Sequence, residues 1–121
     1  MPKTIVIVED FEDTRRLIKF VLEDLGYNVL EAKDGWDAVE VVKKQTPDLI
    51  LMDLALPMIN GLSATRLIRG IEETAQTPII ALTASGQFLH NQALEAGCDD
   101  FVTKPLDVDK LQPLLEKYLP N

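Results

Sequence analysis

The amino-acid sequence predicts an α/β fold: a doubly wound, five-stranded parallel sheet with helices on both faces. Two observations lead to this prediction. Short apolar runs alternate along the chain with longer amphipathic ones, and the short runs at 5–8, 49–52 and 79–82 are apolar at every position. Strands covered by helices on both faces have this composition. Strand-then-helix units joined by right-handed crossovers build such a sheet.

The expected strands are the short runs. They span Thr4–Val8, Asn28–Ala32, Leu49–Met52, Pro78–Leu82 and Phe101–Thr103. Each is followed by a segment in which apolar residues recur at helical spacing. These segments contain Leu17, Ile18, Val21, Leu22 and Leu25; Ala38, Val41 and Val42; Leu67, Ile68 and Ile71; Ala93, Leu94 and Ala96; and Leu111, Leu114, Leu115, Tyr118 and Leu119.

Several residues mark where the helices end. Gly26 and Gly97 follow the first and fourth helical segments, as C-terminal caps do, and Asp34 precedes the second as an N-cap. Pro113 lies inside the last segment, beyond its first turn, where it removes a backbone hydrogen bond. We therefore expect that helix to start late or to be slightly distorted.

Composition limits the class of protein. The chain has 121 residues, no linker and no repeat, so we expect one domain over residues 1–121. A net charge of -8 argues against a nucleic-acid partner and against docking on an anionic membrane. Cys98 is the only cysteine, and neither a signal peptide nor a membrane-spanning run is present. These features predict a cytoplasmic protein.

Polar side chains stand where the expected strands end. They are Glu9 and Asp10 after the first strand, Asp53 after the third, Thr83 after the fourth and Lys104 after the fifth. Functional sites of doubly wound sheets lie outside the carboxyl ends of the strands. A sheet that brings these ends together would therefore place three carboxylates, a hydroxyl and an ammonium in one pocket.

This set of side chains points to phosphoryl chemistry. Three crowded carboxylates repel one another, and a hard divalent cation such as Mg²⁺, which prefers oxygen ligands, would offset that repulsion. A lysine charge and a threonine hydroxyl suit a phosphoryl group. A carboxylate can itself be the nucleophile and form an aspartyl phosphate.

Taken singly, each residue has a plainer interpretation. Asp10 is a helix cap, Glu9 a solvated strand end, Asp53 the start of a loop, Thr83 an ordinary strand residue and Lys104 a surface lysine. The joint occurrence of all five at strand ends favours a shared site.

Over essentially its whole length, the chain resembles the receiver domain of bacterial two-component response regulators. The matching stretches are IVIVED, PDLILMDLALPMINGL, TPIIALTAS and EAGCDDFVTKPL, and the spacing of Asp53, Thr83 and Lys104 agrees with the family. The resemblance implies a flavodoxin-like receiver fold with strand order 2-1-3-4-5.

The resemblance also implies roles for the site residues. Asp53 would accept a phosphoryl group from a phosphohistidine on a sensor histidine kinase or histidine phosphotransfer protein. Mg²⁺ would be held by Glu9, Asp10, Asp53 and the backbone carbonyl of Ala55, and Thr83 and Lys104 would contact phosphoryl oxygens. Thr83 and Phe101 would then move, and a downstream protein target would bind the altered surface of the fourth helix, fifth strand and fifth helix.

Such a protein would be a signalling receiver with at most weak autophosphorylation or autodephosphorylation activity, and a monomer or a weak phosphorylation-dependent dimer. Three alternatives stay open: a module cut from a hybrid kinase or larger regulator, a docking module that is not phosphorylated, and an enzyme acting on small phosphoesters. The last usually needs a second acid where Ala55 stands.

Four further residues carry expectations. Phe11 is either an exposed partner contact or tucked against the first helix. The plainer role of Phe101 is to fill the core, in either signalling state. His90 is expected to be solvated and not to be a phosphoryl donor. Trp36 is expected at the surface or packed at an edge.

Overall fold

Five parallel strands form one sheet in the order β2-β1-β3-β4-β5 in a computed structural model that describes residues 2–56 and 59–120. The strands are β1 (Thr4–Val8), β2 (Asn28–Ala32), β3 (Leu49–Asp53), β4 (Ile79–Thr83) and β5 (Asp100–Thr103). The predicted fold class and strand order are confirmed. The strand boundaries differ by one residue: β3 reaches Asp53, β4 runs from Ile79 to Thr83, and β5 begins at Asp100.

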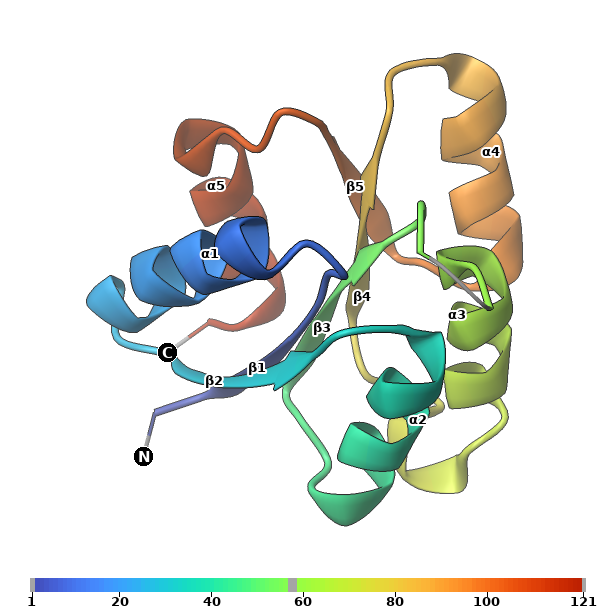
Figure 1. Ribbon diagram of the computed structural model, residues 1–121, viewed down its shortest axis with the longest axis horizontal. Coiled ribbons are helices and arrows are strands. Elements are labelled where there is room, and N and C mark those ends of the chain that lie inside the picture. The colour runs from blue at the N-terminus through green and yellow to red at the C-terminus, as the bar shows by residue number, and fades with distance from the viewer. Residues whose placement is uncertain (1, 57–58, 121) are drawn as a thin grey trace.

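Helices cover both faces of the sheet (Figure 1). On one face lie α1 (Glu12–Asp24) and α5 (Val108–Tyr118). On the other lie α2 (Gly35–Lys44), α3 (Gly61–Arg69) and α4 (Gln87–Ala96), with a short 3₁₀ helix, η1 (Glu72–Thr74), after α3. In the part of the chain described, no helix has the length and apolar composition needed to cross a bilayer.

Alternate residues of each strand enter the two halves of the core. On β1, Ile5 and Ile7 belong to the cluster beneath α1 and α5, whereas Val6 and Val8 belong to the cluster beneath α2, α3 and α4. All five residues of β1 and of β3 are buried. This two-sided burial explains why these strands show no polar alternation in the sequence.

The helix ends agree with the sequence in most places. The Asp34 carboxylate accepts a hydrogen bond from the backbone N–H of Asp37 at 2.7 Å, and Gly97 ends α4 at a φ of 115°, a conformation that favours glycine. The expected late start of the last helix is wrong. It begins at Val108, capped by Asp107, and continues through Pro113.

Candidate functional site

The carboxyl ends of β1, β3, β4 and β5 meet at one edge of the sheet, and the predicted site residues lie there. β3 pairs with β1 on one side and β4 on the other, and β4 pairs with β5. Asp53 pairs in register with Leu82, and Thr83 with Thr103. The strand ends are therefore nearly level, and the residues that follow them come together.

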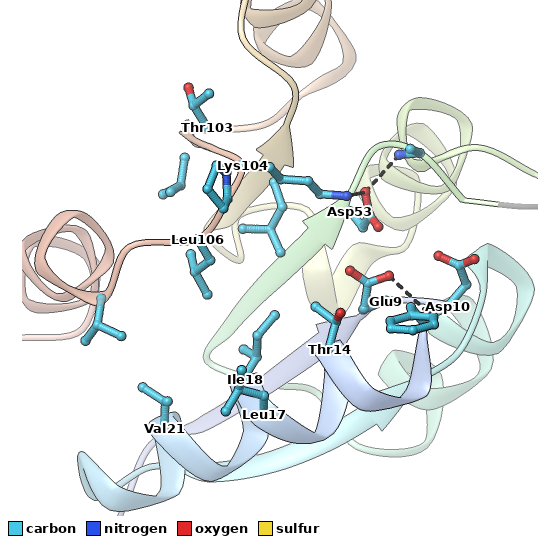
Figure 2. A pocket seen from close by; sticks show the side chains of 16 residues that line it. Glu9, Asp10, Thr14, Leu17, Ile18, Val21, Asp53, Thr103, Lys104 and Leu106 are labelled. Atoms are coloured by element: carbon cyan, nitrogen blue, oxygen red, sulfur yellow. Dashed lines mark hydrogen bonds and ion pairs between the residues drawn. The ribbon is translucent and has the colours of Figure 1, made fainter.

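Three acids form a cluster at this edge. Each of Glu9, Asp10 and Asp53 has a carboxylate oxygen within 4.8 Å of the others'. Glu9 is 4% exposed and Asp53 1%, whereas Asp10 is exposed. Their side chains converge in Figure 2. A compact set of carboxylate oxygens with an open side suits a hard divalent cation that keeps some of its waters.

Glu9 bears the electrostatic consequence of this crowding. The pKa of Glu9 is raised from 4.5 to about 7, and burial is the largest cause. The hydrogen bond from the Phe11 backbone N–H lowers this pKa, and the negative charge of Asp53 raises it. The Phe11 N–H donates to Glu9 Oε2 at 3.1 Å. Glu9 is therefore not the solvated strand end that its position alone suggests, and a bound cation would favour its ionised form.

Asp53 is held by two donors. Its Oδ1 accepts hydrogen bonds from Lys104 Nζ at 2.7 Å and from the backbone N–H of Ala55 at 2.9 Å. Lys104 follows β5, so its side chain reaches past the end of β4 to meet β3. Lys104 thus contacts the acid cluster and is not a simple surface lysine. Asp53 is the last residue of β3 and not the start of a loop.

Thr83 is buried at the end of β4, 2% exposed. Its hydroxyl donates to the carbonyl of Ala84 at 3.1 Å. The structure thus brings the three acids within 4.8 Å of one another and bonds Lys104 to Asp53. Thr83 ends β4, the strand between β3 and β5. Asp10 is not the cap of α1, because Phe11 holds that position and no side chain caps the helix there.

Phe101 and His90 stack on each other. Their ring centroids lie 3.8 Å apart with an interplanar angle of 20°, and both residues are half-buried. The prediction that His90 is solvated is wrong, because its ring covers Phe101. Phe101 itself packs at the margin of the core beneath α2, α3 and α4. Trp36 is 51% exposed, in agreement with its expected surface position.

A groove of about 570 Å³ runs from the acids between α1 and the loop before α5. Figure 2 shows Leu17, Ile18 and Val21 along one wall and Leu106 opposite them, with Asp53 and Lys104 at one end. Phe11, also in its lining, is 61% exposed, and Leu17 is 64% exposed. Phe11 is thus not tucked against α1. In the sequence Leu17 belongs to the same apolar recurrence as the buried Ile18, so its exposure in this groove could not be predicted.

Arg15 also escaped the sequence reasoning. Its Nη1 donates to the backbone carbonyl of Glu9 at 3.0 Å, and its Nε donates to the Glu31 carboxylate at 3.0 Å. The only sequence signal was a basic residue in the second turn of the helix that follows the acid pair.

Comparisons with known proteins agree with this geometry. The family model described as the response regulator receiver domain matches residues 5–116. The polar-differentiation response regulator DivK of Brucella anthropi is 32% identical over 120 residues, which cover 98% of each chain.

Two solved structures are informative. One is the receiver domain of the sensor histidine kinase PA1611 from Pseudomonas aeruginosa PAO1, with a magnesium ion coordinated in its active site cleft; it is 38% identical with a TM-score of 0.92, and the match covers 100% of both chains. The other is the complex of the Saccharomyces cerevisiae histidine phosphotransfer signaling protein Ypd1 with the receiver domain of its downstream response regulator Ssk1. That match has 30% identity and a TM-score of 0.91, and covers 97% of this chain and 88% of the other.

The family model spans nearly the whole chain, and the fold, the strand order and the acid cluster agree with it. This chain therefore belongs to the response regulator receiver domain family of two-component signalling systems.

Proposed function

We propose that this receiver accepts a phosphoryl group from a phosphohistidine onto Asp53 and thereby changes its binding to a downstream protein. One observation carries the proposal: the Asp53 carboxylate lies at the end of an open groove, beside two further acids, with Lys104 Nζ 2.7 Å from its Oδ1. A nucleophile, a cation site and a fixed positive charge are the parts that phosphoryl transfer requires.

Glu9, Asp10, Asp53 and the backbone carbonyl of Ala55 are proposed to hold Mg²⁺. The convergence of the three carboxylates within 4.8 Å supports this assignment, as does the magnesium ion in the cleft of the related PA1611 receiver domain. When bound, Mg²⁺ neutralises charge shared by the carboxylates and the phosphoryl oxygens.

The transfer itself is a displacement at phosphorus. A carboxylate oxygen of Asp53 attacks, the new P–O bond forms, and the P–N bond breaks with its electron pair leaving on the donor imidazole. The Lys104 ammonium, already bonded to Asp53, is within reach of an oxygen of the arriving phosphoryl group. The Thr83 hydroxyl would have to leave the Ala84 carbonyl to bond another.

The output is proposed to arise from that movement of Thr83. Phosphorylation adds about 1.5 to 2 negative charges at Asp53. As Thr83 turns toward them, Phe101 follows inward and separates from His90, which lies on α4. The surface formed by α4, β5 and α5 would change, and a downstream protein target would read the change.

The groove beside α1 is proposed to receive the protein that carries the phosphohistidine. Its apolar walls open directly onto Asp53, and Leu17 and Phe20 on α1 are 64% and 68% exposed. The receiver domain bound to Ypd1 in the yeast complex is similar to this chain, which supports a phosphotransfer protein or a sensor kinase as donor.

Several further predictions accompany this proposed function. Labelling by small donors and self-dephosphorylation are expected to be weak. The single-domain organisation over 1–121, the cytoplasmic location and the state of monomer or weak dimer stay predictions. The similar proteins include a response regulator and a receiver domain of a sensor kinase, so both origins of this module stay open.

The deciding experiment is labelling with acetyl phosphate and Mg²⁺. Wild-type protein should acquire a hydroxylamine-sensitive phosphoryl group, and Asp53→Asn should acquire none because it lacks the nucleophile. Asp24→Asn, at an exposed position near the end of α1, is the matched control and should label normally. Labelling of Asp53→Asn at the wild-type stoichiometry would place the acceptor elsewhere.

A further inference from the structure

We infer that Arg15 is a positioning residue for the magnesium site: its guanidinium fixes the peptide that joins Glu9 to Asp10. The inference rests on the proposed function, in which these two acids are metal ligands. Arg15 is on α1, lies outside the acid cluster, and its side chain is only 14% exposed.

Arg15 connects three parts of the chain. Its Nη1 donates to the Glu9 carbonyl at 3.0 Å and its Nε donates to Glu31 Oε1 at 3.0 Å. Glu31 lies on β2, the edge strand next to β1. One guanidinium therefore ties the end of β1 to both α1 and β2.

The Glu9 carbonyl that Arg15 holds belongs to the peptide that leads into Asp10. The Glu9 N–H donates to the Ala32 carbonyl at 3.1 Å, and Glu9 Oε2 accepts from the Phe11 N–H at 3.1 Å. The bond from Arg15 fixes the other end of the residue, the peptide plane shared with Asp10. Asp10 is exposed, and no core packing restrains its side chain. The orientation of the Glu9–Asp10 peptide therefore sets the direction of the Asp10 carboxylate.

Glu31 keeps Arg15 in place. Burial by itself would raise the pKa of Glu31, but the hydrogen bonds and charges of Arg15 and Lys19 outweigh it, and the net shift is downward. Lys19 Nζ lies 3.4 Å from Glu31 Oε2. The carboxylate thus stays ionised, and its charge-assisted bond holds the guanidinium fork in the orientation that reaches Glu9.

Charge and position predict opposite effects on metal binding. A positive charge near the acids repels a cation, so removing it would strengthen Mg²⁺ binding if charge were its only effect. If Arg15 acts by holding the Glu9–Asp10 peptide, its removal weakens binding. Arg15→Lys distinguishes these two effects. Its ammonium keeps the positive charge but cannot reproduce the planar guanidinium that bonds Glu31 and the Glu9 carbonyl at the same time.

The test is the Mg²⁺ dissociation constant of the full chain, measured by calorimetry for wild type, Arg15→Lys, Arg15→Gln and Arg16→Gln. Both Arg15 variants should bind about tenfold more weakly, the size of effect typical when a residue that orients metal ligands is lost. Arg16→Gln is the matched control, because Arg16 is 70% exposed and pairs with Glu12 on the outer side of α1. Its affinity should not fall.

A second readout needs no metal. In magnesium-free protein, the amide resonances of Asp10 and Phe11 should shift in both Arg15 variants and stay in place in Arg16→Gln. If Arg15→Gln does not fold, Arg15→Lys and these shifts decide the question.

Unchanged or tighter Mg²⁺ binding by Arg15→Gln would overturn the inference, as would wild-type affinity in Arg15→Lys. A wild-type chain that binds no Mg²⁺ would instead overturn the proposed metal site on which the inference rests.

Discussion

Lys104 Nζ lies 2.7 Å from Asp53 Oδ1, although Lys104 follows β5 and Asp53 ends β3, two strands that are not neighbours in the sheet. The side chain of Asp53 is 2% exposed and that of Lys104 is 38% exposed. A partly solvated cation therefore contacts a buried carboxylate from the open side. Any group that reaches Asp53 through the groove meets the ammonium as well, which supports the proposal that Lys104 pairs with a phosphoryl oxygen.

The first prediction concerns that ammonium. Lys104→Ala should slow labelling by acetyl phosphate about 100-fold, because one charge that stabilises the transition state is lost. Its Mg²⁺ affinity should not fall, because a competing cation has been removed. Labelling rates and calorimetry measure the two effects, and exposed Lys110→Ala on α5 is the control. A labelling rate within a few-fold of wild type would exclude the role proposed for Lys104.

The second prediction is a pH dependence that arises at Glu9. Its pKa is about 7 in the folded, metal-free protein against an ordinary value of 4.5. Between these values the folded protein holds a proton that the unfolded chain releases, so this group lowers the free energy of unfolding as pH rises from about 4.5 to 7. This loss of stability is absent below about pH 4.5 and complete above about pH 7.

Mg²⁺ should reverse this trend, because the cation competes with the proton at Glu9. The increase in Tm on adding millimolar Mg²⁺ should therefore be small at pH 5.5 and larger at pH 8, as measured by thermal unfolding. Glu9→Gln should lose the Glu9 part of the metal-free pH dependence. A Mg²⁺-induced increase in Tm that is the same at both pH values would contradict the linkage.

The sequence predicted the fold because its signals were strong and local. The all-apolar runs of β1 and β3 follow from burial on both faces, and Asp34 and Gly97 mark helix ends by their own backbone chemistry. The predicted late start of α5 was wrong, because the Asp107 cap starts the helix at Val108, five residues before Pro113.

Contacts across the sheet were harder to foresee. The site acids and Lys104 could be named because each ends a strand. The bond from Arg15 to the Glu9 carbonyl and the stack of His90 on Phe101 join different elements at distances that spacing along the chain does not reveal. His90 is predicted to be solvated because it lies in the fourth helical segment, where the sequence shows no partner for its ring. The ring of Phe101, 11 positions later in the chain, supplies an apolar surface for it.

The third prediction tests the proposed switch through that stack. Beryllofluoride with Mg²⁺, a mimic of the phosphoryl group, should shift the ring resonances of both His90 and Phe101, because inward rotation of Phe101 separates rings now 3.8 Å apart. Asp53→Asn, treated identically, should show no shift. His90 signals that do not change in the wild-type protein would mean that the two rings stay together on activation.

The fourth prediction separates a protein donor from a small one. Replacing Leu17 and Phe20 together with glutamine leaves the core intact, since both are more than half exposed on α1. Transfer from a phosphorylated histidine phosphotransfer protein that labels the wild type should slow about tenfold or more, because apolar contacts at the centre of an interface dominate its affinity. Acetyl phosphate, which needs no docking surface, should label the variant at the wild-type rate.

Leu94→Gln on α4, 46% exposed, makes a similar change on the opposite layer and should leave both reactions unchanged. Equal slowing of both donors would indicate damage to the site itself, and normal transfer from the phosphotransfer protein would show that its docking surface lies away from this part of α1.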